Sequence, residues 1–115
     1  MVQINGIISQ GENIADNGGI REAFRAYENY VIHNGVEPRL PGLEKYSAEQ
    51  LFFISYANIW CGKQNLESLR EQITNGPHSP NRYRVIGPLS NSQDFAKHFQ
   101  CPIGIMNRPK KCILW

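Results

Sequence analysis

The segment from residue 51 to residue 60 constrains the fold of this chain more than any other. It has the sequence LFFISYANIW, so apolar side chains would occupy nearly every face of a helix formed there. A helix that is apolar all round has to be covered by protein on every side. The chain has only 115 residues with which to cover it. We therefore expect this helix to be buried inside something larger than the chain itself.

The longest periodic stretch runs from Glu12 to about His33. Its apolar residues recur every three or four positions, which is typical of one face of a helix. An Asn-Gly stop signal follows at 34–35. Two glycines at 18–19 lie inside this pattern, where each costs about 1 kcal/mol relative to alanine. We therefore expect another segment to pack closely against this part of the helix.

Three further helices are expected, and the chain as a whole is predicted to be mainly α-helical. Ser47 and Gln50 have the spacing of a capping box, which predicts that the apolar helix begins there. Asn65 is suited to cap a helix that ends near residue 75, and Asn91 or Ser92 is suited to cap a last helix. The remaining segments are 1–10, expected as a short strand or an extended entry; 35–46 and 77–80, expected as loops; and 84–87, expected as extended or helical.

The composition indicates an ordinary globular protein. Hydrophobic residues make up 41% of the chain and charged residues 19%, which excludes a disordered tail. No run of about 18 uncharged apolar residues is present, so we expect no membrane-spanning segment, and the first residues lack the pattern of a signal peptide. The net charge of +2 does not indicate a nucleic-acid partner. Residues 78–115 hold six Lys or Arg against one Asp, which favours a surface that neutralises acidic neighbours over an anion-binding one.

The cysteines form an odd set. Cys61, Cys101 and Cys112 include no CxxC pair, so their spacing matches neither a zinc ribbon nor a thioredoxin-type redox site. Two interpretations are open at this point. The cysteines are free buried thiols, which the count alone slightly favours, or they form disulfides with cysteines outside this chain.

Four polar residues could carry chemistry. Glu12 and Asp16 are one helical turn apart and project from the same face, which suits a metal or base site. Spacing alone favours a solvated first turn instead, because acidic groups there are stabilised by the helix dipole. His78 lies between two prolines in a stiff loop, with Arg84 six residues later; such a loop can hold an imidazole for catalysis, although a lone loop histidine is more often a surface residue. No HExxH, GxSxG, P-loop or GxGxxG motif is present.

Several short segments, taken in order, match one known family. The segment GENIADNGG at 11–19 resembles the same segment of the neprilysin and endothelin-converting-enzyme family of zinc metallopeptidases. The resemblance continues through LFF at 51–53, WCG at 60–62, HSP at 78–80, RVIG at 84–87, FQC at 99–101 and CILW at 112–115. Residues 1–115 therefore resemble the C-terminal part of that family's catalytic domain. This implies a mainly α fold, the C-terminal helical subdomain of a zincin-type, thermolysin-like metallopeptidase that is incomplete on its own.

The resemblance implies a role for each of the four polar residues. Glu12 matches the family's third zinc ligand. Asp16 matches the carboxylate that holds one ligand histidine through its other ring nitrogen. His78 matches the residue that donates a hydrogen bond to the oxyanion of the tetrahedral intermediate. Arg84 matches the guanidinium that binds a backbone carbonyl of the substrate and is steadied by Asp16.

The resemblance also implies a substrate pocket and disulfides. Ile59 and Trp60 match part of the pocket wall around the large apolar side chain that follows the scissile bond. Cys61, Cys101 and Cys112 match cysteines whose partners all lie upstream in the family's ectodomain. The odd count then needs no free thiol.

One departure from the family pattern dominates. The HExxH helix, which supplies two zinc histidines and the glutamate that activates water, is not in this sequence. Of the three protein ligands to Zn²⁺ only Glu12 is here, and the other two are expected upstream. We therefore expect this polypeptide to be inactive alone. We also expect Phe24, Phe52, Ile59 or Trp60 to be unusually exposed on an apolar groove beside Glu12.

The function implied by the resemblance is that of a segment of a zinc metalloendopeptidase, which hydrolyses peptides on the amino side of large apolar residues. Its partners would be peptide substrates and the remainder of the catalytic domain. Its location would be outside the cell or at the cell surface. The alternative is a truncated, non-catalytic product that binds peptides or a partner. An HExxH in the upstream reading frame would distinguish the enzyme from this alternative.

Overall fold

The computed structural model describes residues 3–113. Within that range the chain forms five α-helices and no β-strand, apart from one isolated bridge between Gly104 and Asn107. The helices are α1 (Gln10–Asn34), α2 (Ala48–Ile59), α3 (Leu66–Asn75), α4 (Asn81–Asn91) and α5 (Gln93–His98). The prediction of a mainly α-helical chain is confirmed.

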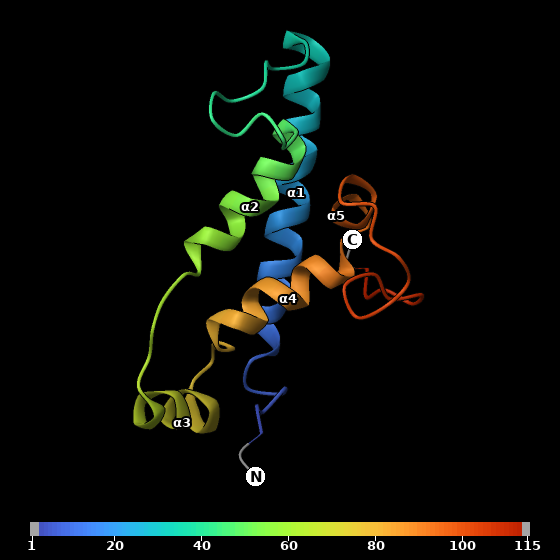
Figure 1. Cartoon of the computed structure of the whole chain (residues 1–115). Coiled ribbons are helices and arrows are strands. Elements are labelled where there is room, and N and C mark those ends of the chain that lie inside the picture. Colours follow the sequence, from blue (N-terminus) through green and yellow to red (C-terminus); the bar gives the residue numbers. More distant parts are fainter. Residues whose placement is uncertain (1–2, 114–115) are drawn as a thin grey trace.

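The 25-residue helix α1 is the axis on which the other helices are arranged. In Figure 1, α2 begins beside the upper half of α1 and slants away from it, and α4 crosses the lower half of α1. Helix α3 lies at the bottom on one side, and α5 with the C-terminal tail lies on the other side. Because Glu12 and Asp16 are near the start of α1, they fall where α4 crosses it.

A small core of apolar residues forms where these helices cross. Ile20 and Phe24 of α1, Phe53 of α2 and Leu89 of α4 are its buried members. The Phe24 and Phe53 rings stack with their centroids 4.8 Å apart. The expectation that Phe24 is unusually exposed is wrong, since it is 1% exposed: α2 and α5 cover it without help from outside the chain.

The rest of α2 is covered far less well. Phe53 is its buried residue, and Phe52 and Trp60 are half-buried. Ile59 is 73% exposed at the end of the helix, and Leu66 is equally exposed at the start of α3. The expectation of an exposed apolar side chain is therefore confirmed at Ile59. Nothing within the described chain encloses α2 completely.

The predicted helix starts and stops have the expected local chemistry. Ser47 Oγ accepts from the Gln50 backbone N–H at 3.1 Å, and Gln50 Oε1 accepts from the Ser47 N–H at 2.9 Å, so the capping box is confirmed. Asn65 caps α3 and Ser92 caps α5 through side-chain oxygens. Gly35 ends α1 with φ of +84°, a conformation that favours glycine.

Three short segments decide local expectations from the sequence. Residues 84–87, for which extended and helical conformations were both open, are helical within α4. The expectation of a strand or extended entry at 1–10 is wrong over residues 6–9, which form a turn bonded to the Asn5 side chain and carbonyl. Gly18 is buried, whereas a Cβ added at Gly19 would meet no atom within 4 Å, so the predicted close neighbour is missing there.

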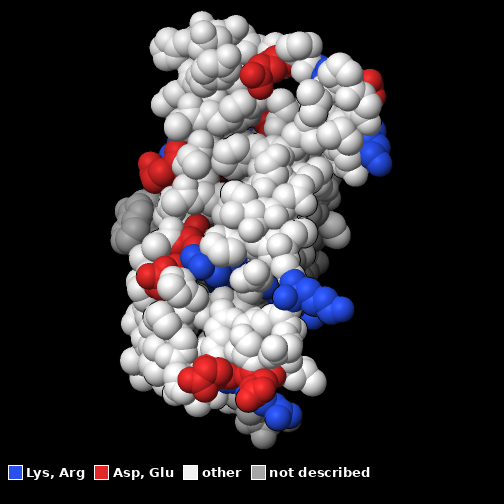
Figure 2. Space-filling view, turned by 90° about the vertical axis from the view of Figure 1, so that its left-hand side faces the viewer, with Lys and Arg blue, Asp and Glu red and all other residues white. Residues whose placement is uncertain are grey.

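No helix among the described residues is long and apolar enough to cross a membrane. Figure 2 shows acidic and basic side chains interspersed over one face of the molecule, with broad uncharged areas between them. That face therefore has no large field of a single sign.

Candidate functional site

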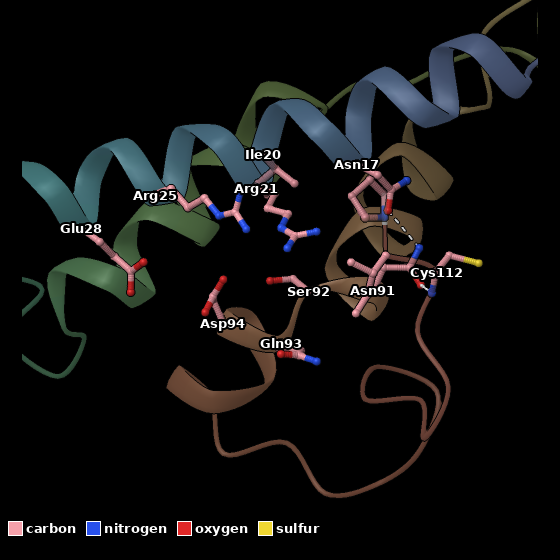
Figure 3. A pocket seen from close by; sticks show the side chains of 12 residues that line it. Asn17, Ile20, Arg21, Arg25, Glu28, Asn91, Ser92, Gln93, Asp94 and Cys112 are labelled. Atoms are coloured by element: carbon pink, nitrogen blue, oxygen red, sulfur yellow. Dashed lines mark hydrogen bonds between the residues drawn. The ribbon is translucent and has the colours of Figure 1, made fainter. Parts of the chain in front are cut away.

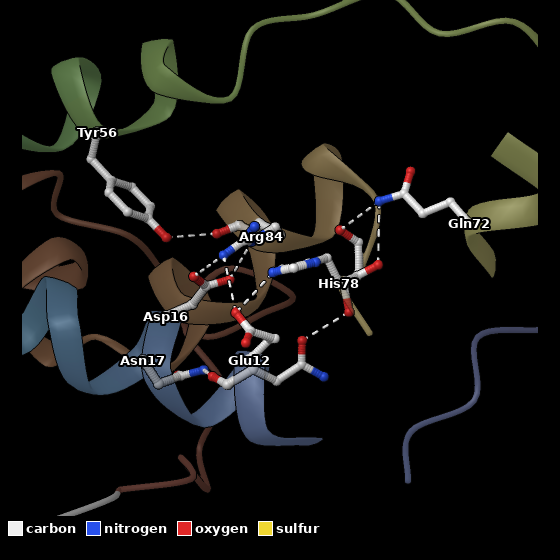
Figure 4. Close-up of polar contacts among 9 residues, drawn as sticks. Glu12, Asp16, Asn17, Tyr56, Gln72, His78 and Arg84 are labelled. Atoms are coloured by element: carbon white, nitrogen blue, oxygen red, sulfur yellow. Dashed lines mark hydrogen bonds and ion pairs between the residues drawn. The ribbon is translucent and has the colours of Figure 1, made fainter. Parts of the chain in front are cut away.

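Glu12 and Asp16 both approach the side chain of Arg84, which comes from α4 (Figure 4). Arg84 donates from Nε to Asp16 Oδ2 and from Nη2 to Asp16 Oδ1, each at 2.7 Å. The same Nη2 is 4.0 Å from Glu12 Oε2. The two carboxylates therefore share one face of α1, as their spacing predicts. The interpretation of this pair as a merely solvated first turn is wrong, because α4 packs a cation against it.

The Arg84–Asp16 pair is largely removed from water. The exposed fractions of the two side chains are 15% and 9%. Two parallel N–H···O bonds fix the guanidinium in the plane of the carboxylate, which is the strong geometry for such pairs. The hydrogen bond to Asp16 raises the pKa of Arg84 above its already high usual value. Arg84 is therefore a fixed positive charge at this point of the molecule.

Residues of α2 and its C-terminal end hold Arg84 from another side. The Trp60 ring centre lies 3.9 Å from Arg84 Cζ, which is a cation–π contact. The Tyr56 hydroxyl donates to the Arg84 carbonyl at 2.7 Å. Burial, followed by the charge of Asp16, raises the pKa of Tyr56 to about 12, so this hydroxyl keeps its proton at neutral pH. Trp60 thus belongs to the site directly.

His78 lies opposite Glu12, in the loop between α3 and α4. Its Nε2 is 3.0 Å from Glu12 Oε2, and the exposed fractions of the two side chains are 46% and 42%. This pair is therefore at the open side of the cluster, whereas Arg84 and Asp16 form its inner part. The structure brings together all four of the polar residues that the sequence predicts.

Further polar side chains hold the His78 loop in place. Ser79 Oγ donates to Asn13 Oδ1 of α1 at 2.8 Å. From α3, Gln72 Nε2 donates toward the carbonyls of His78 and Ser79 at 3.2 and 3.3 Å. The loop is therefore held between α1 and α3.

Sequence reasoning missed Asn13, Gln72, Tyr56 and Ser79 as parts of this site. Asn13 could have been noticed in the sequence, because it is a polar amide directly next to Glu12 on the predicted helix. Ser79 and Gln72 act through contacts that a sequence does not reveal, since Ser79 and Asn13 are 66 positions apart.

The remaining predicted residues are Ile59 and the three cysteines. Ile59 ends α2 and is mostly exposed next to Trp60. All three cysteines have free thiols, and Cys61 and Cys112 are exposed. The interpretation of these two as buried thiols is therefore wrong.

One side chain of this cluster, that of Glu12, is suited to bind zinc. A carboxylate oxygen such as that of Glu12 is a suitable zinc ligand, and a catalytic site uses three protein ligands. Within residues 3–113, no group of three or more His, Cys, Asp or Glu side chains is arranged to hold a metal ion. Glu12 could thus be one ligand, and the described residues do not form a complete zinc site.

A cavity of about 230 Å³ lies away from these residues, between α1 and the junction of α4 and α5 (Figure 3). Arg21 and Arg25 point into it from α1, opposite Ser92 and Asp94. None of the four predicted polar residues lines it. It is therefore a different feature from the apolar groove that was expected beside Glu12.

Comparison with known proteins agrees with the resemblance seen in the sequence. The model of peptidase family M13 matches residues 1–114. The chain is 54% identical over 114 residues to neprilysin-11 of Caenorhabditis elegans, covering 98% of this chain and 13% of that protein. It is 51% identical over 113 residues to human endothelin-converting enzyme 1, covering 97% of this chain and 14% of that protein. The chain thus spans about one seventh of the length of these relatives.

A solved structure has the same fold at the level of the backbone. The structure titled "Haemonchus galactose containing glycoprotein complex" superposes with a TM-score of 0.86 at 43% sequence identity, over 94% of this chain and 19% of that one. The helical arrangement described above is therefore shared with a larger protein. Because the family match extends over nearly the whole sequence, the chain belongs to peptidase family M13.

Proposed function

We propose that this chain is the C-terminal segment of the catalytic domain of a zinc metalloendopeptidase, which cuts peptides on the amino side of large apolar residues. The observation that carries this proposal is the convergence of Glu12, Asp16, His78 and Arg84 from two helices and a loop. Membership of family M13 supports the reaction class. The remaining ligands, the general base and the rest of the substrate cleft belong to segments outside these 115 residues.

In this proposal Glu12 is one of three protein ligands to Zn²⁺, and two histidines of an HExxH helix are the others. The metal, when bound, polarises the scissile carbonyl and activates water. Asp16 steadies one ligand histidine. Both of its oxygens already accept from Arg84, but each carboxylate oxygen has a second lone pair with which to accept another hydrogen bond.

Arg84 binds a backbone carbonyl of the substrate in this proposal. Two of its five N–H donors are used on Asp16, so others are left for a ligand. Its plane is held by Asp16 and Trp60, so it loses little further freedom on binding. His78 donates from its imidazole to the oxyanion of the tetrahedral intermediate.

Trp60 and Ile59 form part of the apolar pocket for the residue after the scissile bond. The exposed thiols of Cys61 and Cys112, together with Cys101, pair with cysteines of the preceding segments. Because disulfides form in oxidising compartments, the protein in this proposal lies outside the cell or at its surface. The partners of this chain are peptide substrates and the rest of its own catalytic domain.

The test uses the full-length polypeptide that contains this chain. Glu12→Gln should remove zinc-dependent hydrolysis of a peptide with a large apolar residue and lower zinc affinity by more than the roughly 10- to 100-fold typical of an outer partner. Glu22→Gln is the matched control, because Glu22 lies on the same helix and pairs with Arg25 on an exposed face. Peptide binding without hydrolysis in the unmodified protein would favour the non-catalytic alternative instead.

A further inference from the structure

A line of partly buried hydrogen bonds connects the start of α1 to the loop that carries His78. Ser79 is 5% exposed, and its Oγ donates to Asn13 Oδ1 at 2.8 Å. Asn13 Nδ2 donates in turn to Ser9 Oγ at 3.1 Å. Ser9 is 1% exposed and donates to the Asn5 carbonyl at 3.2 Å. Because Asn13 is bonded at both ends of its amide, its oxygen is fixed toward the loop.

Asn13 follows Glu12 directly on α1, and Ser79 follows His78 directly in the loop. Successive helical residues project about 100° apart, so two neighbours on α1 reach two different points of the loop. Glu12 Oε2 is 3.0 Å from His78 Nε2, and Asn13 Oδ1 is 2.8 Å from Ser79 Oγ. The first contact is half exposed, whereas Ser79 in the second is buried. The contact between Asn13 and Ser79 is the less exposed of the two, and it is therefore the one suited to fix the distance between helix and loop.

The second side of the loop is held by its backbone. Gln72 of α3 donates toward the carbonyls of His78 and Ser79. Prolines at 77 and 80 restrict the backbone on either side. Within residues 3–113, the polar partner of the His78 imidazole is Glu12 alone, so the position of the ring follows from where the loop is placed.

We propose that Asn13 and Ser79 are positioning residues whose hydrogen bond sets the distance between His78 and Glu12, and so aims the imidazole at the oxyanion. The inference rests on the proposed function for the reaction that His78 serves. A donor to an oxyanion is effective only when it is already in place as charge develops. Displacement of such a group by about 1 Å can cost on the order of 100-fold in rate.

The test compares three variants of the full-length zinc-loaded polypeptide: Asn13→Ala, Ser79→Ala and the pair together. Asn34→Ala is the matched control. Asn34 lies at the other end of α1, is exposed, and donates to the Tyr30 carbonyl rather than to the loop. The probes are an apolar peptide substrate and a phosphonopeptide of the same sequence, which mimics the tetrahedral intermediate.

We expect Asn13→Ala and Ser79→Ala to weaken binding of the phosphonopeptide about tenfold while KM for the peptide changes less than twofold. The double variant should be no worse than Asn13→Ala alone, because both substitutions remove the same bond between Asn13 and Ser79. Amide exchange of a peptide covering 77–82 should become about fivefold faster in both, as expected for the loss of one hydrogen bond. Asn34→Ala should change none of these quantities.

Equal changes in KM and in phosphonopeptide affinity would overturn the proposal, since they would indicate general damage. Unchanged exchange at 77–82 in Asn13→Ala would overturn it too. If Asn13→Ala fails to fold, Ser79→Cys repeats the test with almost no change of shape. If the unmodified protein neither cuts the peptide nor binds the phosphonopeptide, the proposed function is wrong. The amide-exchange measurement then tests by itself whether the bond between Asn13 and Ser79 holds the loop.

Discussion

Two regions of this molecule are built from similar side chains and differ in how well they are covered. In the packed crossing, which comprises Ile20, Phe24, Phe53 and Leu89, each residue is at most 6% exposed. In the open end, which comprises residues 59–66, the apolar residues Ile59 and Leu66 are each 73% exposed. The packed crossing has helices on several sides, whereas the open end leads away from α1 toward α3 (Figure 1). Coverage therefore depends on the available neighbours and not on how apolar a residue is.

The polar cluster lies where these two regions meet. Arg84 is bonded to Asp16 of α1 on one side and stacked on Trp60, at the start of the open end, on the other. The side of the cluster that faces the packed crossing is held in place by packing, and the side that faces the open end is accessible. This arrangement suits residues that have to be held in place while they meet a partner from outside.

The largest effect is expected from a change in the packed crossing. Phe24→Ala should lower the free energy of unfolding by about 3–5 kcal/mol, because it removes a buried ring and leaves a cavity. Ile32→Ala on the same helix is the matched control. Ile32 is 75% exposed, so its truncation should cost at most about 0.5 kcal/mol. Urea denaturation of both variants measures the difference, and equal effects would contradict the contrast between the regions.

The contact between α1 and α4 should contribute the next largest effect. Asp16→Asn leaves the largely buried Arg84 charge with the more distant Glu12 carboxylate, 4.0 Å from Nη2, as its remaining counterion. It should cost about 2–3 kcal/mol, at the lower end for buried pairs because of this second carboxylate and because the side chains keep some exposure. Glu22→Gln breaks the Arg25–Glu22 pair, which has a similar 2.8 Å distance but exposed fractions of 47% and 55%. That control should cost about 0–0.5 kcal/mol. If Asp16→Asn cost as little as Glu22→Gln, the Arg84–Asp16 pair would not stabilise the contact between α1 and α4.

Much of this arrangement is predictable from local sequence signals. The capping box at Ser47, the cap at Asn65 and the stop at Gly35 are local, because each depends on residues within one turn. The shared face of Glu12 and Asp16 follows from helical spacing. These features are encoded by neighbouring residues, and the structure has them where the sequence predicts them.

The features that sequence reasoning missed are contacts between distant segments. The burial of Phe24 depends on α2 and α5 reaching it, and the Ser79–Asn13 bond joins residues 66 positions apart. The helical conformation at 84–87 was ambiguous because four residues carry too little periodicity to distinguish a helix from a strand. The resemblance to a family indicated which four polar residues lie together, but it did not indicate what holds the His78 loop.

A smaller effect, with a dependence on pH, is expected at Tyr56. Burial raises its pKa from 10.0 to about 12, because the folded state disfavours the tyrosinate. The resulting stability is therefore fully present below pH 10 and is lost as pH rises from 10 through 12. Tyr56→Phe should lower the free energy of unfolding by about 1 kcal/mol at neutral pH, because the bond to the Arg84 carbonyl is lost. The variant should also lose less stability between pH 10 and 12, because the group that titrates there is gone. Tyr83→Phe, at a residue 51% exposed, is the control and should leave the alkaline loss unchanged.

The smallest effect on the stability of this chain is expected for a substitution at the open end, and it tests directly whether this region is covered in a longer polypeptide. Ile59→Ser should change the free energy of unfolding of the 115-residue chain by at most about 0.5 kcal/mol, because the side chain is already mostly in water. In the full-length polypeptide, where other segments of the proposed catalytic domain would complete the pocket wall around Ile59, the same substitution should cost more, up to the roughly 1.5–3 kcal/mol of a fully buried aliphatic side chain. Denaturation midpoints of both polypeptides, with and without the substitution, measure the two costs. If the cost were equally small in the longer polypeptide, Ile59 would be solvent-exposed there as well, and the open end would be surface rather than an interface.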